Sequence, residues 1–456
     1  MTKKSVTERE LVMECLLEIT RDGQYSHIAL RNLLSKYQYL DKKERAFITR
    51  CVEGTLEHMI EIDYIIGQFS KVKVNKMKPV IRTIARSSVY QLKYMDSVPD
   101  SAVCNEAVKL AVKKGFVNLK GFVNGLLRNI ARNIEQIEYP DEDTPEGLSV
   151  RYSMPQWILK LWLDEYDIET VKVMLEDFLK EKPTVIRCCL SQMPKEVLIE
   201  KLQAEHVTVK EHPYLPYALS ISGYDYLEAL ESFREGGFYV QDIGSMLVAE
   251  VAGPKEGDQV IDVCAAPGGK ALHIADKLAG TGMVEARDLT EAKVSLIEEN
   301  IERAGLKNIR AVQKDASLPD EASVCRADIV VADLPCSGLG VLGRKTDLKY
   351  KLTEEMTEEL SALQKKILTQ AGTYVKPGGT LVYSTCTVNK KENEDNVRWF
   401  LEHFREFSLV KFDHLLTGTI KEEAGRDGTL QLLPGIHESD GFFIAKFKKA
   451  QASEEN

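Results

Sequence analysis

The sequence predicts a multidomain protein with an all-α front segment, a small α+β segment in the middle and an α/β domain at the end. Three patterns predict this order. Apolar residues recur at helical spacing over residues 5–132, helix and strand patterns mix over 150–237, and strand–helix units repeat from residue 238. At 456 residues, the chain is also too long for one ordinary domain.

Composition narrows the class of protein. Hydrophobic residues make up 44% of the chain and charged residues 29%, as expected for well-formed cores with a soluble surface. No apolar run reaches the roughly 20 residues that a membrane helix needs. The start "MTKKSVTERELVMEC" has charges where a signal peptide needs an apolar core, so we expect no secretory signal. Nine irregularly spaced cysteines then favour free thiols in a reducing compartment, so we expect a cytoplasmic protein without a membrane partner.

Charge is distributed unevenly along the chain. Residues 1–132 carry 23 Lys and Arg against 14 Asp and Glu, a net charge of +9, whereas residues 133–456 carry −19. A basic front segment suggests polyanion binding, with Lys/Arg clusters near 71–86 and 109–132 as its best candidates. Solvated, lysine-rich helix faces explain the same charge equally well, so charge alone does not decide the function.

The front segment, residues 1–134, is predicted to consist of helices. Apolar residues recur at helical spacing in "ELVMECLLEI", in one long run from "ERAFITR" to "IIGQF", and in "PVIRTIARSSVYQLKYM", "SAVCNEAVKLAVKKG" and "NLKGFVNGLLRNIARN". Pro79 suits the first turn of a helix, while Pro99 and Gly115 mark breaks. The acidic stretch 135–149 lacks periodicity and is predicted to be a linker.

The rest of the chain is predicted to form two domains and a tail. Over 150–237, helical stretches around "QWILKLWL" and "PKEVLIEKLQAE" mix with the strands "TVIRCCL", "YALSIS" and "GFYVQD", which indicates a small α+β domain. Over 238–449, "QVIDVC", "GMVEARDL", "IRAVQKDA", "ADIVVADLPC" and "GTLVYSTC" alternate with amphipathic helices, and two strands close the domain. This alternation predicts a mostly parallel sheet covered on both faces. Residues 450–456 are expected to be disordered.

Candidate ligand-binding residues follow the first three strands of that sheet. In an open α/β sheet, ligands bind beyond the carboxyl ends of the strands. The turn "CAAPGGK" (264–270) follows the first strand, and Gly268 and Gly269 would let a ligand approach the main chain. It is neither a phosphate loop nor a full GxGxxG, and a plain tight turn is the alternative.

Two acids extend this candidate site. Asp288 ends the second strand and can accept hydrogen bonds from a ribose diol, with Glu285 as the fallback if the register differs. Asp315 ends the third predicted strand and can accept from an adenine amino group. Each acid alone is more often a loop cap, but three strand ends together favour a ligand site.

Two cysteines follow the fourth and fifth strands, Cys336 in "DIVVADLPCSGLG" and Cys386 in "TLVYSTCTV". Because consecutive strands usually lie side by side, we expect both sulfurs in one crevice. Zinc lacks further nearby ligands, so no metal is expected, and a disulfide is disfavoured by the compartment. The remaining cysteines are expected to be small buried hydrophobic residues: Cys15, Cys51, Cys104, Cys188, Cys189 and Cys325.

Nucleophilic chemistry is the remaining role for the pair. A pyrimidine ring is one target that needs a nucleophile, because a thiolate that adds to carbon 6 makes carbon 5 nucleophilic. A second thiol could then help to remove the carbon 5 proton or assist release. Asp333, just before Cys336, can hydrogen-bond the edge of the base and stabilise the developing charge.

The motifs "DVCAAPGGK", "ADLPCSGLGVLGR" and "YSTCTVNKKENEDNV" resemble the RNA cytosine-5 methyltransferases of the Nol1/Nop2/Sun family. The stretch "KGFVNGLLRNI" is similar to the last helix of the antitermination factor NusB, a domain of the family's bacterial small-subunit rRNA enzymes. The resemblance implies a NusB-like RNA-binding domain, a small α+β (RRM-like) RNA-binding module and a Rossmann-like methyltransferase domain. Leu334, where alanine is common, and the missing proline in "NKKENED" are departures that concern loop shape.

The resemblance also implies roles for individual residues. Cys386 would be the nucleophile on carbon 6, and Cys336 would resolve the covalent intermediate. S-adenosyl-L-methionine would be bound by Cys264, Ala265, Ala266, Pro267, Gly268, Gly269, Lys270, Asp288, Asp315 and Asp333.

We therefore expect a monomeric enzyme that methylates carbon 5 of a cytosine in 16S rRNA, in an unassembled or partly assembled small subunit. The same chemistry on tRNA or 23S rRNA is one alternative, and a non-catalytic RNA-binding or antitermination factor is another. An exocyclic-amine methyltransferase is a third, but it would not need a nucleophile at Cys386.

Overall fold

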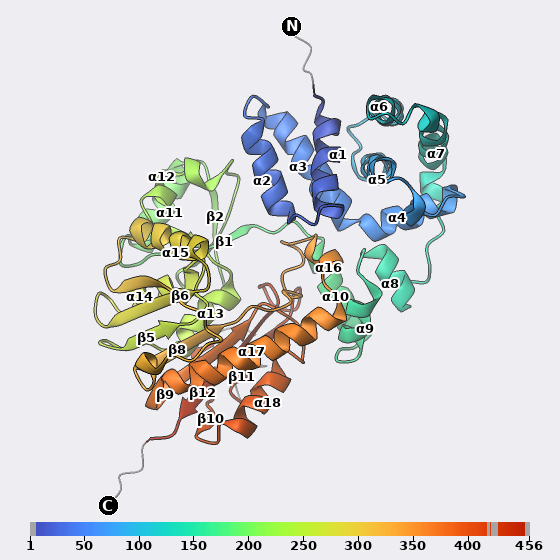
Figure 1. The fold of residues 1–456 in the computed structure, drawn as a ribbon. Helices are drawn as coiled ribbons and strands as arrows, with labels where there is room; N and C mark the ends of the chain where they lie inside the picture. Colours follow the sequence, from blue (N-terminus) through green and yellow to red (C-terminus); the bar gives the residue numbers. More distant parts are fainter. Residues whose placement is uncertain (1–5, 417–419, 421–426, 452–456) are drawn as a thin grey trace, which may run out of the picture. The chain divides into compact units, whose positions relative to one another are not determined.

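The structure, a computed structural model, describes residues 6–416, 420 and 427–451. They fall into two compact units (Figure 1). Unit 1 comprises Met1–Leu179 with Leu342–Leu352, and unit 2 comprises Lys180–Val341 with Thr353–Asn456. The tail expected over 450–456 lies outside the described residues from 452 onward. In the described part of the chain, no helix has both the length and the apolar character needed to cross a bilayer.

Unit 1 is built of helices, as the periodicity predicts. Asp41 and Glu44 form a reciprocal capping box at the start of α3, and Pro79 occupies the first turn of α5. The long run predicted over 44–69 is broken at His58, which ends α3 and begins α4. The α-helices are α1 (Glu8–Thr20), α2 (Ser26–Lys36), α3 (Lys42–Glu57), α4 (Met59–Phe69), α5 (Pro79–Tyr94), α6 (Asp100–Lys113), α7 (Lys120–Asn133), α8 (Pro145–Arg151), α9 (Gln156–Leu163), α10 (Ile168–Phe178) and α16 (Leu348–Lys351).

The segment 342–352 belongs to unit 1 although it lies between two elements of unit 2 in the sequence. The Asp347 carboxylate accepts hydrogen bonds from the Ser26 backbone N–H (3.1 Å) and hydroxyl (2.7 Å). The buried Lys349 ammonium donates to the carbonyl of Glu57 at 3.1 Å, and the Tyr350 hydroxyl to that of Leu56 at 2.8 Å. Polar contacts therefore hold this segment among the helices of unit 1.

Unit 2 begins with a small antiparallel sheet in the order β2-β3-β1-β4. Its elements are β1 (Thr184–Cys188), α11 (Lys195–Ala204), β2 (Thr208–Glu211), β3 (Ala218–Ser222), α12 (Glu231–Arg234) and β4 (Phe238–Val240). The periodicity predicts β1, β3, β4 and α11 but not β2. That strand is short and mostly exposed, so its sequence carries little apolar signal.

The larger sheet has eight strands in the order β10-β12-β9-β8-β5-β6-β7, with β11 paired to β12. The pairs from β9 to β7 are parallel, whereas β12 pairs antiparallel with β9, β10 and β11, so the sheet is mixed. Its elements are α13 (Ile243–Ala252), β5 (Gln259–Asp262), α14 (Gly269–Lys277), β6 (Met283–Asp288), α15 (Glu291–Ala304), β7 (Ile309–Gln313), β8 (Ala327–Asp333), α17 (Glu354–Tyr374), β9 (Val375–Thr385), α18 (Glu394–His403), β10 (Phe407–Leu409), β11 (Thr429–Leu432) and β12 (Phe442–Lys449).

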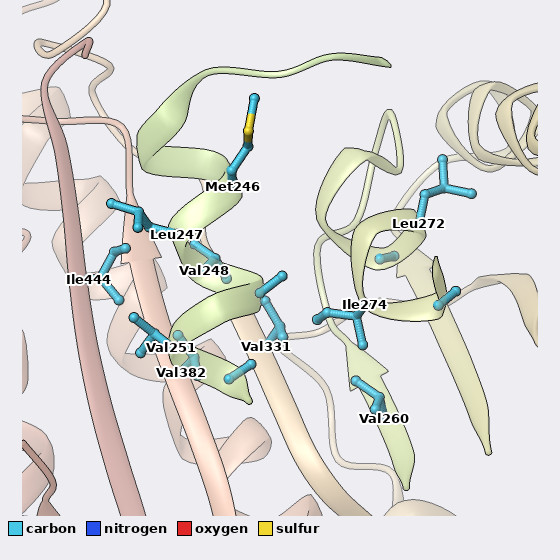
Figure 2. Packing of buried hydrophobic residues seen from close by; sticks show 14 of the residues in the cluster. Met246, Leu247, Val248, Val251, Val260, Leu272, Ile274, Val331, Val382 and Ile444 are labelled. Atoms are coloured by element: carbon cyan, nitrogen blue, oxygen red, sulfur yellow. The ribbon is translucent and has the colours of Figure 1, made fainter. Parts of the chain in front are cut away.

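Both faces of this sheet are covered, because successive residues of a strand point to opposite sides. Val331 and Val382 pack with residues of α13 and α14 in one buried cluster. Their neighbours Val330 and Leu381 pack with residues of α17 and α18 in another. Figure 2 shows the first cluster, where Leu247, Val248 and Val251 of α13 lie over β8, β9 and β12. Such double-sided burial explains the near-continuous apolar runs of the central strands.

Besides β2, three further elements depart from the pattern-based expectation. The predicted linker 135–149 runs into α8, which begins at Pro145 under a Thr144 cap. Helix α13 and strand β11 were not predicted. Helix α13 is hydrophobic on nearly every side, so it lacks the amphipathic pattern that marks a surface helix.

We predict that Lys349→Met stabilises unit 1 in a pH-dependent way. Burial lowers the pKa of Lys349 to about 7, below its unfolded value of about 10.4, so the unfolded state binds more protons between these pH values. The wild type therefore gains stability as pH rises through this window. The variant should be more stable at pH 7 by about 2–4 kcal/mol, a gain that shrinks toward pH 10.

Urea unfolding at pH 7 and pH 9.5 measures this difference. Lys345→Met, which removes an exposed lysine from the same segment, serves as the control and should change little at either pH. A gain from Lys349→Met that is equal at both pH values would contradict the buried, neutralised lysine.

Candidate active site

The parallel pairing of β8 and β9 places two cysteines together. Asp333 at the end of β8 is in register with Ser384 near the end of β9. Cys336 and Cys386 follow these strands, and their Sγ atoms are 3.4 Å apart. Both side chains are partly buried, and neither cysteine forms a disulfide. The site is thus formed by two loops that leave adjacent strands at the same edge of the sheet.

The surroundings of Cys336 set its protonation state. The hydrogen bond to Cys386, followed by burial, raises the pKa of Cys336 well above its ordinary value, so Cys336 stays a neutral thiol at pH 7. Its S–H can therefore donate toward the Cys386 sulfur. Among the described residues, no three His, Cys, Asp or Glu side chains are grouped to hold a metal ion.

The remaining cysteines follow the buried-hydrophobe expectation with one exception. Five of them are buried: Cys15, Cys51, Cys104, Cys188 and Cys189. Cys325 is exposed, which corrects the expectation for that residue. It lies in a turn before β8 with a φ of 53°, where its backbone N–H, not its side chain, is bonded to Thr373.

A partly buried ion pair lies beside the thiols. The Lys270 ammonium is 2.6 Å from Asp333 Oδ2, and Asp333 Oδ1 accepts a hydrogen bond from the Ser384 hydroxyl at 2.8 Å. Burial lowers the pKa of Lys270, but the charge and hydrogen bond of Asp333 and the charges of Asp262 and Cys386 outweigh this and leave the pKa raised. Lys270 is therefore an ammonium within electrostatic reach of the Cys386 sulfur.

The turn 264–270 joins β5 to α14 through a left-handed glycine. Gly268 has a φ of 109° and precedes the first residue of α14, Gly269. A Cβ on Gly269 would meet only Gln241 Cδ, at 3.9 Å, so the main chain there is open to close approach. The backbone N–H groups at the start of α14 provide donors at this point.

Asp262 at the end of β5 was missed by the motif reasoning. Its side chain is fully buried, with Oδ1 accepting from the Cys264 N–H at 3.3 Å and Oδ2 lacking a partner among the described residues. Burial, with the negative charge of Asp333, raises the pKa of Asp262 to about 7. Its position at a strand end could have marked Asp262 as a candidate ligand-binding residue. It was not among the predicted residues because it precedes the glycine-rich turn.

The two other predicted acids lie at the ends of β6 and β7. Asp288 is buried and accepts from the Ala266 N–H at 3.0 Å and from Lys293 Nζ at 2.9 Å. Glu285, the fallback, pairs instead with Arg287 and Arg310 on the sheet. Asp315 lies two residues past the end of β7, where hydrogen bonds from Ser317 lower its pKa. The structure brings Asp288 to the turn 264–270, while Asp315 is held in its own loop.

A further polar group lies behind the thiols. The Glu392 carboxylate is fully buried and accepts hydrogen bonds from the backbone N–H of Ser337 at 2.9 Å and from Gln364 Nε2 at 2.9 Å. Periodicity does not mark it, because it stands in a polar stretch, "NKKENED", that looks solvent-exposed. Its burial is a property of the folded loops alone.

Comparisons with known proteins match both ends of the chain. Residues 249–448 match the family described as 16S rRNA methyltransferase RsmB/F, and residues 6–132 match the NusB family. The probable ribosomal RNA small subunit methyltransferase B of Bacillus subtilis (strain 168) is 34% identical, over 98% of this chain and 99% of its own length. The Synechocystis protein of the same description is 32% identical, over 98% of this chain and 100% of its own length. These matches confirm the expected NusB-like front and methyltransferase domain.

Solved structures are similar as well. The crystal structure of PH0851 matches with a TM-score of 0.81 and 26% identity, covering 98% of this chain and 100% of that one. The structure of NSun6 from Pyrococcus horikoshii with SFG matches with a TM-score of 0.58 and 26% identity, covering 65% of this chain and 98% of that one.

We predict that Gly268→Ala destabilises unit 2, because a Cβ is strained at a φ of 109°. The expected loss is about 1–2 kcal/mol in the free energy of unfolding. Gly269→Ala is the matched control, since that residue is helical and its Cβ would meet only one atom within 4 Å. It should stay within about 0.5 kcal/mol of wild type. Urea unfolding of both variants checks this, and equal losses would contradict the assigned strain.

Proposed function

This chain belongs to the RsmB family of ribosomal RNA small subunit methyltransferases, and on that premise we propose that it methylates carbon 5 of a cytosine in 16S rRNA. The observation that supports this is the 3.4 Å contact between Cys336 and Cys386 beside the Lys270–Asp333 pair. Methylation of an exocyclic amine needs neither sulfur, whereas methylation of carbon 5 needs a covalent activation of the ring.

The residues present fit S-adenosyl-L-methionine, which supplies an electrophilic methyl group. We assign its binding to the turn 264–270 together with Asp288, Asp315 and Asp333. The open main chain at Gly269 leaves space for close approach, and the cofactor's ribose hydroxyls and ammonium group are donors that suit carboxylate acceptors. The unpartnered Asp262 Oδ2 adds a further polar atom at this point, and a donor from the cofactor would satisfy it.

In this proposal Cys386 is the nucleophile. Its thiolate adds to carbon 6 of the cytosine, the C5–C6 electron pair moves toward carbon 5, and carbon 5 takes the methyl group. Loss of the carbon 5 proton then returns the electron pair and breaks the C6–S bond. The Lys270 ammonium lies within electrostatic reach of the Cys386 sulfur and would favour its thiolate form. We assign Asp333 to hydrogen-bond the base.

Cys336 resolves the intermediate in this scheme. Free Cys336 holds its proton mainly because of the hydrogen bond to Cys386. When the Cys386 sulfur bonds to the base, the sulfur loses its negative charge. The hydrogen bond that mainly raises the pKa of Cys336 is then lost. The pKa of Cys336 then falls, although burial still raises it. Once Cys336 has lost its own proton to water, its thiolate can take the carbon 5 proton.

The RNA must present the cytosine unstacked, because the nucleophile and the methyl donor approach carbons on different faces of the ring. We assign phosphate contacts to a helical domain over 1–134 and to the small α+β segment that follows it, predicted over 150–237 as an RRM-like RNA-binding module. Residues 238–449 form the catalytic domain of a monomer that acts on an unassembled or partly assembled small subunit.

We predict that Cys386→Ala abolishes both methyl transfer and covalent adduct formation, because it removes the nucleophile. Cys336→Ala should instead let an RNA–protein adduct accumulate, because the intermediate forms but is not resolved. Denaturing gels of enzyme incubated with labelled 16S rRNA and S-adenosyl-L-methionine measure the adduct. Cys325→Ala, at an exposed thiol, is the control and should behave as wild type. The opposite behaviour of the two variants would reverse their roles.

We predict that purified enzyme labels protein-free 16S rRNA and gives 5-methylcytosine on digestion. Transcripts of 23S rRNA and total tRNA, incubated in parallel with labelled cofactor, should take up at most background label. The Cys386→Ala protein controls for contaminating activities. Exclusive labelling of tRNA would overturn the substrate assignment, and label on an exocyclic amine would overturn the reaction.

A further inference from the structure

The buried Glu392 carboxylate is bonded by four donors. Oε2 accepts from the Ser337 N–H and Gln364 Nε2, both at 2.9 Å. Oε1 accepts from the Ser337 hydroxyl and from Asn389 Nδ2, the latter at 2.8 Å. Because all four partners donate, the group serves purely as an acceptor, which an ionised carboxylate does and an amide does not.

These donors belong to the elements on either side of the thiols. Ser337 directly follows Cys336, and Gln364 of α17 also donates to the carbonyl of Pro335 at 2.8 Å. Both neighbours of Cys336 are therefore tied to the same buried network. Asn389 lies three residues beyond Cys386, in the loop that follows β9.

Direct bonds between the two loops run through the same place. The Ser337 hydroxyl lies 2.7 Å from Thr387 Oγ1, and the Gly340 N–H donates to the carbonyl of Cys386 at 3.1 Å. Hydrogen bonds to a buried charged group are stronger than neutral ones, and leaving their donors unpaired is costly. The loop 334–341 is thus bonded to the loop 386–393 both directly and through Glu392.

We propose that Glu392 is a positioning residue that holds the Cys336 loop against the Cys386 loop and so keeps the two thiols in contact. The proposal deepens, and in its catalytic consequence rests on, the function proposed above. Glu392 does not touch the reacting atoms. It acts through Ser337, whose two hydrogen bonds to the carboxylate fix the chain next to Cys336.

We call the hydrogen bonds of Glu392 to Ser337, Gln364 and Asn389 the clamp. Its loss would change the contact and the reactivity of Cys336. In Glu392→Gln, the amide nitrogen would face donors that the carboxylate oxygen accepts from, so part of the network must separate. Cys336 would leave Cys386, lose the hydrogen bond that raises its pKa, and become more reactive toward electrophiles. The contact that supports resolution of the intermediate would be lost at the same time.

Alkylation of Cys336 by iodoacetamide in the full-length protein tests the clamp without RNA or cofactor. Peptide mass spectrometry follows the rate in wild type, Glu392→Gln, Ser337→Ala and the control Glu402→Gln, an exposed carboxylate on α18. We expect about tenfold faster alkylation in Glu392→Gln, about threefold in Ser337→Ala, and no change in the control. Equal rates in wild type and Glu392→Gln would overturn the inference; if that variant fails to fold, the Ser337→Ala rate decides in the same way.

A kinetic measurement separates this inference from the proposed function. Methyl transfer to 16S rRNA by Glu392→Gln should show kcat reduced about 10- to 100-fold with KM for RNA unchanged, as expected for misplaced catalytic groups. A raised KM with unchanged kcat would count against a positioning role at the thiols. Wild-type protein that makes no 5-methylcytosine would refute the proposed function. The alkylation rates would still show whether Glu392 holds the two thiols in contact.

Discussion

The parallel pairing of β8 with β9 is the constraint on which the site depends. Each strand ends in a polar residue and then turns into a loop that carries a cysteine, and the register sets Asp333 beside Ser384. A shift by one residue would turn the apolar side chains of a strand to the wrong face of the sheet. Burial on both faces therefore fixes the register, and the register brings two sulfurs 50 residues apart in sequence to 3.4 Å.

Electrostatics then set the charge of Lys270 at this edge of the sheet. The acids Asp333 and Asp262 at the strand ends keep Lys270 charged in spite of burial. Cys336 keeps its proton because it shares a hydrogen bond with the Cys386 sulfur and because it is buried. The surroundings of this thiol thus set its protonation state, as they commonly do for titratable groups in active sites.

The loop after Cys336 is held by polar contacts along its length. Its first part is bonded to the buried Glu392 in unit 2. Its later part, 342–352, is bonded among the helices of unit 1 through Asp347 and Lys349. Buried polar groups cost free energy unless they are paired, so each contact favours one loop conformation over the alternatives.

By itself, the sequence determined the order of elements, the helical character of the front segment and the strand ends where chemistry could occur, because periodicity and turn residues are local signals. Helix α13 and strand β11 were not predicted, because a helix that is buried on all sides and a short strand carry weak local patterns. Only the tertiary structure decided that Asp262 and Glu392 are buried, that Lys270 pairs with Asp333, and that 342–352 packs with unit 1. These features depend on contacts between residues distant in sequence. A polar stretch has the same sequence pattern whether water or protein surrounds it, so the pattern does not predict its burial.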